Sequence, residues 1–166
     1  MGYSFSKGYY PRYADNKFNG RVTRLLVTPL IKSLIKLFGN NDYLEFIDSF
    51  RYPLAGEYAL KKNLLRDLKI PSDWGLEIGI LSELQRSYSS KLCCQVDLAD
   101  HYDHKHQDLS EDDKSKGLSR MTIDITKAFL RKMATQGYIF TEESFRTLKA
   151  TYFRNCLLYT SDAADD

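Results

Sequence analysis

The sequence is poor in cysteine, with only three in 166 residues, and two of these are the neighbours Cys93 and Cys94. Adjacent cysteines are badly placed to bridge each other, and three thiols cannot build the disulfide framework of a small secreted domain. We therefore expect free thiols on a buried strand in a reducing cytoplasm. The sequence also lacks any apolar run close to the ~20 residues that span a membrane, so we expect no membrane association.

A strong charge of either sign is missing as well. Twenty-four basic residues face twenty-two acidic ones, and the net charge is +2. Such a balance makes no electrostatic case for nucleic acid or a membrane surface. Only the basic, tyrosine-rich N-terminus points toward nucleic acid, and it carries no recognised binding motif.

Hydrophobic spacing predicts a mixture of helices and strands, in a chain long enough for one domain with a core. Thr28 and Pro29 suit the start of a helix and Gly39 suits its end. The mixture predicts an α/β or α+β fold. The expected elements are an aromatic loop or irregular strand over 3–20, a helix over 28–38, an unassigned apolar stretch over 43–50, a short helix over 61–68, a helix over 76–88, a strand over 91–99, a long helix over 118–136 and a last helix from Thr141.

All three histidines fall within six residues, in the polar stretch 100–116. Aspartates lie beside them, so carboxylate oxygens and an imidazole nitrogen are available together. This ligand chemistry suits Mg²⁺ or Mn²⁺ better than zinc, because no thiol spacing supports zinc. A solvated polar loop explains the same residues, and both interpretations stay open. The residues concerned are His101, His104 and His106, with Asp97, Asp100, Asp103 and Asp108.

A second candidate is the segment Gly20-Arg21-Val22-Thr23. Arginine presents a planar fork to phosphate or carboxylate, glycine lets a ligand approach the backbone, and threonine supplies a hydroxyl. A simple turn before a helix explains the segment equally well.

A third candidate is the segment from Trp74 to Gly79. The carboxylate of Glu77 could bind sugar hydroxyls, and the ring of Trp74 could stack on a sugar. The alternative is helix N-terminal electrostatics for Glu77 and core packing for the tryptophan. Glu57, which follows a proline and a glycine, has the same two interpretations.

The last eleven residues, 156–166, resemble the translation of a sequencing adapter. We therefore expect residues 1–155 to be one natural unit and 156–166 to be a non-native tail. The competing interpretation is a genuine acidic terminus with some helical character.

Five short segments occur together in a particular order and spacing. This arrangement resembles the glucosyl-3-phosphoglycerate synthases, over residues 3 to 136. The segments are Gly20-Arg21-Val22-Thr23, Pro53-Leu54-Ala55-Gly56-Glu57-Tyr58-Ala59, Trp74-Gly75-Leu76-Glu77-Ile78-Gly79, Gln95-Val96-Asp97-Leu98 and Asp103-His104-Lys105-His106.

The resemblance implies the helix-rich, acceptor-side part of a GT-A type glycosyltransferase fold. The family's reaction transfers glucose, with retention, from a nucleotide donor to the 2-hydroxyl of 3-phosphoglycerate. It uses a divalent metal, Mg²⁺ or Mn²⁺, which is held by an Asp-x-Asp motif and one histidine. Relatives commonly dimerise, so a homodimer is left open.

By resemblance, site roles pass to individual residues of this chain. His104 would bind the metal. The phosphoglycerate would lie against Gly20, Arg21 and Thr23. Glu77, the catalytic candidate, and Trp74 would contact the glucose, and His106 stands where many relatives have an asparagine that touches the acceptor.

No Asp-x-Asp motif in the family's strand context precedes Gly20. We therefore expect the nucleotide-binding half upstream of Met1, and an isolated chain that is inactive. Two alternatives remain, a related transferase with another sugar or acceptor and a non-catalytic module that binds a metal or an anion.

Overall fold

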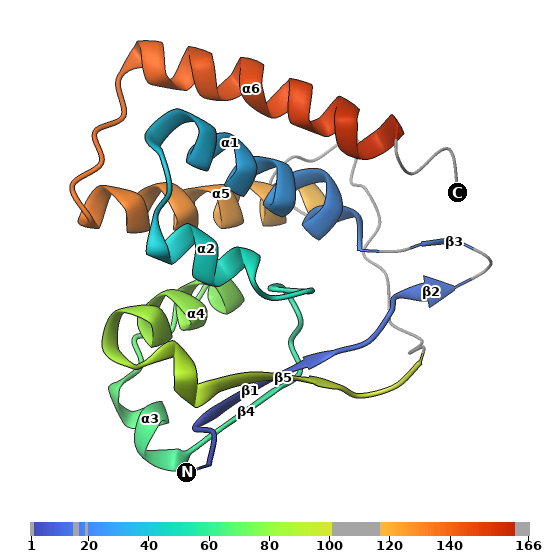
Figure 1. The fold of residues 1–166 in the computed structure, drawn as a ribbon, viewed down its shortest axis with the longest axis vertical. Coiled ribbons are helices and arrows are strands. Elements are labelled where there is room, and N and C mark those ends of the chain that lie inside the picture. The colour runs from blue at the N-terminus through green and yellow to red at the C-terminus, as the bar shows by residue number, and fades with distance from the viewer. Residues whose placement is uncertain (1, 15–16, 19, 101–116, 162–166) are drawn as a thin grey trace.

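A three-stranded sheet lies at one end of the molecule, and helices are stacked on one side of it (Figure 1). The computed structural model describes residues 2–14, 17–18, 20–100 and 117–161. Strand β1 (Phe5–Tyr9) lies in the middle, antiparallel to β4 (Tyr58–Leu60) and parallel to β5 (Cys93–Asp97). A short hairpin, β2 (Tyr13–Ala14) with β3 (Lys17–Phe18), extends from the end of β1. The expected helix-rich α/β class is confirmed.

Strand β1 buries an unusual pair of side chains on one face. Phe5 and Lys7 are two residues apart, so they project to the same side of the sheet, and both are almost fully buried. The register pairs Lys7 with Tyr58 on β4 and with Gln95 on β5. A lysine is thereby placed under the helical layer, where an apolar residue is the usual occupant.

The first long helix begins earlier than expected. A π-helical segment, η1 (Thr23–Val27), runs directly into α1 (Thr28–Phe38), and Arg21 and Val22 are already helical. The prediction that Thr28 caps this helix is wrong, because the N–H of Thr28 already donates to the carbonyl oxygen of Thr23. Pro29 in the first turn and Gly39 at the end, where φ is 85°, are as expected.

The apolar stretch after Gly39 forms α2 (Asp42–Asp48). The side chain of Asn41 caps it by accepting hydrogen bonds from the backbone N–H groups of Tyr43 and Leu44, at 2.9 and 3.1 Å. The other expected helices are present with shifted ends. They are α3 (Lys62–Asp67), α4 (Leu76–Ser87), α5 (Gly117–Thr135) and α6 (Glu142–Ser161), and a 3-10 turn (Ser90–Leu92) precedes β5.

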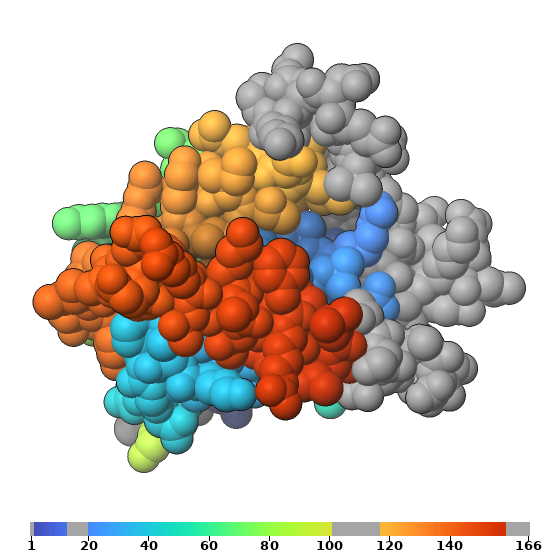
Figure 2. All heavy atoms as spheres, turned by 90° about the horizontal axis from the view of Figure 1, so that it is seen from above, coloured from blue at the N-terminus to red at the C-terminus, as the bar shows by residue number. Residues whose placement is uncertain are grey.

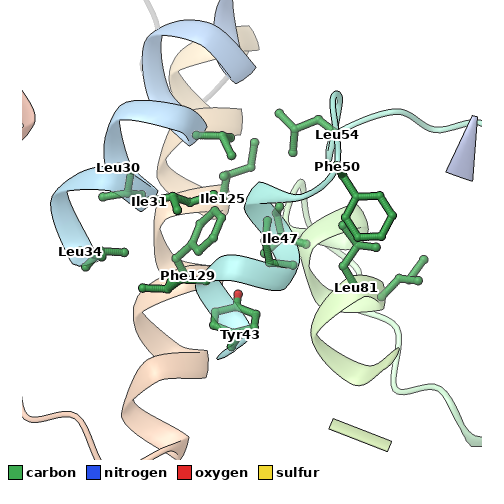
Figure 3. Packing of buried hydrophobic residues seen from close by; sticks show 14 of the residues in the cluster. Leu30, Ile31, Leu34, Tyr43, Ile47, Phe50, Leu54, Leu81, Ile125 and Phe129 are labelled. Atoms are coloured by element: carbon green, nitrogen blue, oxygen red, sulfur yellow. The ribbon is translucent and has the colours of Figure 1, made fainter. Parts of the chain in front are cut away.

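The core lies between α1, α2, α4 and α5, and its apolar side chains interdigitate at the centre of the molecule (Figure 3). The hydroxyl of Tyr43 is buried there and accepts a 3.2 Å hydrogen bond from Ser82. Burial raises the pKa of Tyr43. The labelled residues of this core are Leu30, Ile31, Leu34, Tyr43, Ile47, Phe50, Leu54, Leu81, Ile125 and Phe129.

Helix α6 lies across α1 on the outside of this core (Figures 1 and 2). The hydroxyl of Tyr152 donates to the carbonyl oxygen of Leu25 at 2.6 Å, and the side chain of Asn155 donates to Ser33 at 2.8 Å. The helix continues without a break into the predicted tail and ends at Ser161. Helical character belonged to the competing interpretation, in which residues 156–166 are a genuine terminus. A helix does not decide between the two interpretations, so the non-native origin of these residues stays a prediction.

One expectation about burial is wrong, and one of the two interpretations of Trp74 is not supported. Cys93 and Cys94 have free thiols, but they are only half-buried, and Val96 further along β5 is exposed, because β5 is an edge strand. Trp74 is 41% exposed ahead of α4, so core packing does not explain it. No described helix is long and apolar enough to cross a membrane.

Candidate functional site

A cavity of about 210 Å³ opens where β1 ends and the first long helix begins. In Figure 1 this is the region in which β1 leads toward β2 and β3 leads toward α1. Three separate segments line it: the end of β1, one side of the helix, and the loop after α2. The lining residues are Tyr9, Tyr10, Pro11, Arg12, Gly20, Thr23, Arg24, Thr28, Arg51 and Tyr52.

Gly20 lines the cavity and immediately precedes the helix, which begins at Arg21. Gly20 has a φ of 89°, and a Cβ atom there would lie 3.0 Å from the ring of Tyr52. Both the backbone conformation and the close contact therefore favour glycine at this position. The start of a helix presents free N–H groups and a partial positive charge, which favour an anion beside it.

Two polar atoms in the cavity wall are buried but have no hydrogen-bond partner among the described residues. They are the Oγ1 atom of Thr23 and the Nε atom of Arg24. Thr23 is 7% exposed, and Arg24 is half-buried. Buried donors and acceptors are nearly always paired, so these atoms call for a ligand or water. Both residues belong to the π-helical segment η1, and π-helical turns are frequent at functional sites.

Arg12 also lines the cavity, and it is held there by aromatic rings and an acid. Its guanidinium lies 4.1 Å from the ring centre of Tyr52 and 5.2 Å from that of Tyr10. One terminal nitrogen is 4.0 Å from Oε2 of Glu57, and the hydroxyl of Tyr10 donates to Oε1 of the same carboxylate at 3.0 Å. Stacking and charge together restrict the guanidinium to one position beside the cavity.

Arg51 contributes a third cation, on the exposed side. Its guanidinium lies 5.2 Å from the ring centre of Tyr9 and 3.5 Å from a carboxylate oxygen of Asp97. Its backbone N–H donates to Oε1 of Gln95 at 2.8 Å, and the amide nitrogen of Gln95 donates to the carbonyl oxygen of Ser49 at 2.8 Å. The Gln95 side chain therefore attaches the loop after α2 to strand β5.

Lys7, which does not line the cavity, joins two of the sequence segments that motif spacing singled out. Its ammonium donates a 2.6 Å hydrogen bond to the carbonyl oxygen of Ala55. Burial lowers the pKa of Lys7 to about 8, and the carboxylates of Glu77 and then Glu57 partly oppose this shift. Glu77, at the start of α4, and Glu57, ahead of β4, thus act on the same buried charge.

Comparison with known proteins agrees with the motif arrangement. The chain is 46% identical over 154 residues to the glucosyl-3-phosphoglycerate synthase of Persephonella marina, and 44% identical over 133 residues to that of Methanococcoides burtonii. These alignments cover 93% and 79% of this chain. A Petrotoga mobilis protein of the same name is 32% identical over 118 residues.

The chain is similar to the glucosyl-3-phosphoglycerate synthases. The resemblance predicted from the motifs is confirmed. The chain spans 38% of the Persephonella marina protein and 32% of the Methanococcoides burtonii protein. No family model matches the chain, and no solved structure matches it.

The structure gathers some of the predicted site residues and leaves others apart. Gly20 and Thr23 line the cavity, whereas Arg21 is exposed at the helix start and does not line it. Glu77 is half-buried in the first turn of α4. It is close enough to Lys7 for its carboxylate to oppose the lowering of the Lys7 pKa by burial. Trp74 is exposed just before α4.

The structure does not test the predicted metal site, because the three histidines are not among its described residues. His104, His106 and His101 lie outside the described residues. Within the described part of the chain, no three histidine, cysteine, aspartate or glutamate side chains come close enough to hold an ion. The described residues by themselves do not provide a metal-binding set.

The residues that sequence reasoning missed include Lys7, Arg12, Arg24 and Tyr52, which shape the site. A signal for two of them was present. Lys7 stands at an inward position of an alternating strand, and Arg12 follows closely on Tyr9 and Tyr10. Arg24 and Tyr52 carry no comparable local pattern, because their roles depend on elements that meet only in the folded chain.

Proposed function

We propose that residues 1–155 form the acceptor-side part of a glucosyl-3-phosphoglycerate synthase, and that residues 156–166 are a non-native tail. The complete enzyme would transfer glucose from a nucleotide-glucose donor to the 2-hydroxyl of 3-phosphoglycerate, with retention. The observation that carries this proposal is the cavity at Gly20, because arginines from three segments line it together with the start of a helix.

The cavity suits a small anionic acceptor. Its volume of about 210 Å³ is below the ~300–1,000 Å³ typical of pockets for drug-sized ligands. A phosphorylated three-carbon acid is small and carries two anionic groups. Arg21, which is exposed beside Gly20 at the helix start, would attract such an acceptor electrostatically, while Gly20 and Thr23 contact it in the cavity.

The sugar would lie toward α4. The exposed ring of Trp74 is free to stack on a sugar face, and the carboxylate of Glu77 can accept hydrogen bonds from its hydroxyls. The ammonium of Lys7 attracts the Glu77 carboxylate and favours one position for it. In this arrangement the acceptor hydroxyl attacks from the face on which the leaving phosphate departs, and that phosphate takes the proton.

The complete enzyme is proposed to use Mg²⁺ or Mn²⁺, with His104 as one ligand and an Asp-x-Asp motif outside this chain as the others. When bound, the ion would neutralise charge on the leaving diphosphate. His106 would contact the acceptor. A cytoplasmic location follows from phosphorylated substrates, and the proposal includes no nucleic-acid or membrane binding and leaves a homodimer open.

The test is a transfer assay on the complete enzyme, recovered by sequencing the DNA that flanks this reading frame. With nucleotide-glucose, Mg²⁺ and 3-phosphoglycerate, we expect an α-linked glucosyl product, visible by the anomeric proton signal. His104→Ala should abolish the metal-dependent rate, whereas the neighbouring control His101→Ala should retain it.

Other results identify the alternatives. Transfer only from another sugar nucleotide, or only to another acceptor, would indicate a related transferase. Binding of anions without any transfer would indicate a non-catalytic module. The isolated 166-residue chain is expected to be inactive, because it contains no Asp-x-Asp donor motif in the family's context.

A further inference from the structure

Arg24 differs from the other two arginines of the cavity. Arg12 pairs with Glu57 and Arg51 pairs with Asp97. Arg24 has no carboxylate partner among the residues that the structure describes, and its Nε atom is buried without a hydrogen bond. Of the cavity's three guanidinium groups, Arg24 therefore has the charge that no described acid neutralises.

Arg24 lies on the same side of the helix as Gly20, but one turn farther along the helix axis. The lining residues Gly20, Thr23, Arg24 and Thr28 follow the spacing of one helix side. Arg24 comes one turn after Gly20, and one turn of helix rises by about 5 Å. One ligand could therefore meet the Gly20–Thr23 turn with one anionic group and the Arg24 guanidinium with another.

A structural role alone does not explain this arrangement. An arginine that only supports packing usually gives its buried N–H groups to carbonyl or carboxylate oxygens, because an unpaired buried donor costs stability. Here both Arg24 Nε and Thr23 Oγ1 lack such partners in the described chain. A charge-assisted hydrogen bond to a ligand would offset that cost.

We infer that Arg24 binds the second anionic group of a doubly charged acceptor, while the Gly20–Thr23 turn binds the first. The cavity thereby requires both the phosphate and the carboxylate of the acceptor. This inference rests on the proposed function, and it adds a specificity-determining residue that motif resemblance does not assign.

The test measures binding without catalysis. The 166-residue chain is titrated calorimetrically with 3-phosphoglycerate, with glycerol 3-phosphate, which lacks the carboxylate, and with glycerate, which lacks the phosphate. The variant is Arg24→Gln. The matched control is Arg146→Gln, an exposed arginine on α6 that pairs with Glu142 within the same helix.

We expect Arg24→Gln to weaken 3-phosphoglycerate binding by about tenfold or more, the effect of losing a charge-assisted contact. Glycerol 3-phosphate keeps only the phosphate, and glycerate keeps only the carboxylate. Arg24→Gln should weaken binding of the probe that keeps the group contacted by Arg24, to the same degree as for 3-phosphoglycerate. It should leave the affinity for the other probe unchanged. Arg146→Gln should change none of the three affinities.

Different failures have different meanings. Unchanged 3-phosphoglycerate binding by Arg24→Gln, or equal weakening of both truncated probes, overturns the inference and leaves the proposed function standing. A wild-type chain that binds none of the three probes overturns the proposed acceptor site itself. If Arg24→Gln does not fold, as judged by its circular dichroism, Arg24→Lys replaces it and must still weaken 3-phosphoglycerate binding.

Discussion

The ammonium of Lys7 on β1 donates a 2.6 Å hydrogen bond to the main-chain carbonyl oxygen of Ala55. Through this bond the central strand holds the loop that carries the Pro53–Glu57 segment. The same ammonium lies 5.5 Å from the ring centre of Tyr58 and is attracted by Glu77 and Glu57. One buried cation therefore connects the strand, the loop and the start of α4.

The first prediction concerns stability and pH. Burial lowers the pKa of Lys7 to about 8 from its ordinary value of 10.5, so between these values the unfolded chain holds more protons than the folded one. The contribution of Lys7 to the free energy of unfolding should rise with pH across this window, by about 2 kcal/mol between pH 7 and pH 10. Urea unfolding of the wild type and of Lys7→Met at both pH values measures it.

Other titrating groups affect both proteins alike, so the difference between the two proteins isolates Lys7. A stability difference that stays constant from pH 7 to pH 10 would show that the ammonium is not held in the folded state with a lowered pKa.

The second prediction separates binding from stability at Arg12. Arg12→Ala should weaken 3-phosphoglycerate binding about tenfold, because the cavity loses a fixed guanidinium. It should also reduce the free energy of unfolding by about 1 kcal/mol, because the Oε2 atom of Glu57 loses the cation that lies 4.0 Å away. Calorimetric titration and urea unfolding measure the two effects.

The double variant Arg12→Ala with Glu57→Gln is the control. It should recover most of the stability, since the unpaired charge is gone, but none of the affinity. Recovery of the affinity would mean that Arg12 only neutralises Glu57 and does not contact the acceptor.

The third prediction tests a buried acid on α5. Asp124 is 2% exposed, and its carboxylate accepts a 2.9 Å hydrogen bond from Nε of Arg120, one turn earlier. Arg120→Ala leaves this carboxylate without its cation and should cost about 2 kcal/mol of stability. Arg131→Ala, at an exposed position on the same helix, should change stability by less than about 0.5 kcal/mol. If thermal or urea unfolding shows the same loss of stability for both variants, the Arg120–Asp124 pair does not stabilise the fold as predicted.

The fourth prediction concerns Gly79 in α4. A Cβ atom there would lie 2.3 Å from Cγ of Pro71, which is closer than two non-bonded carbon atoms can approach. Gly79→Ala should therefore lower stability by about 1–2 kcal/mol, although alanine is favoured over glycine inside a helix by about 1 kcal/mol. Gly56→Ala is the control, because nothing lies within 4 Å of its added Cβ. A stabilised Gly79→Ala protein would mean that the loop at Pro71 shifts without cost.

Most of the helices were predictable because their apolar residues recur at helical spacing over three turns or more. This holds for α1, α4 and α5, whose buried faces match the sequence pattern. Helix α2 was not assigned, because its seven residues are too few to distinguish helix from strand by periodicity. The π-helical start of α1 was missed, since no local residue pattern distinguishes a π turn from an α turn.

The site was predictable only in part. Glycine and threonine at the helix start could be identified, because their backbone and side-chain chemistry is local. Arg21 was preferred to Arg24 from the sequence, yet Arg24 lines the cavity and Arg21 does not. The difference depends on which side of the helix meets β1 and the loop after α2, and a helix start by itself does not contain that information.

The amino-acid sequence by itself determined most of the helices, the ordered motifs and the resemblance to glucosyl-3-phosphoglycerate synthases, because each depends on neighbouring residues or on their order. Only the tertiary structure decided which charges meet. Lys7 meets Ala55 through a hydrogen bond and Glu77 through electrostatic attraction, because packing of the helices against the sheet brings these distant segments together. For the same reason Arg12 stacks on Tyr52, and both line one cavity with Arg24. Electrostatic and hydrogen-bonded contacts act over a few ångströms of space, whatever the separation along the chain.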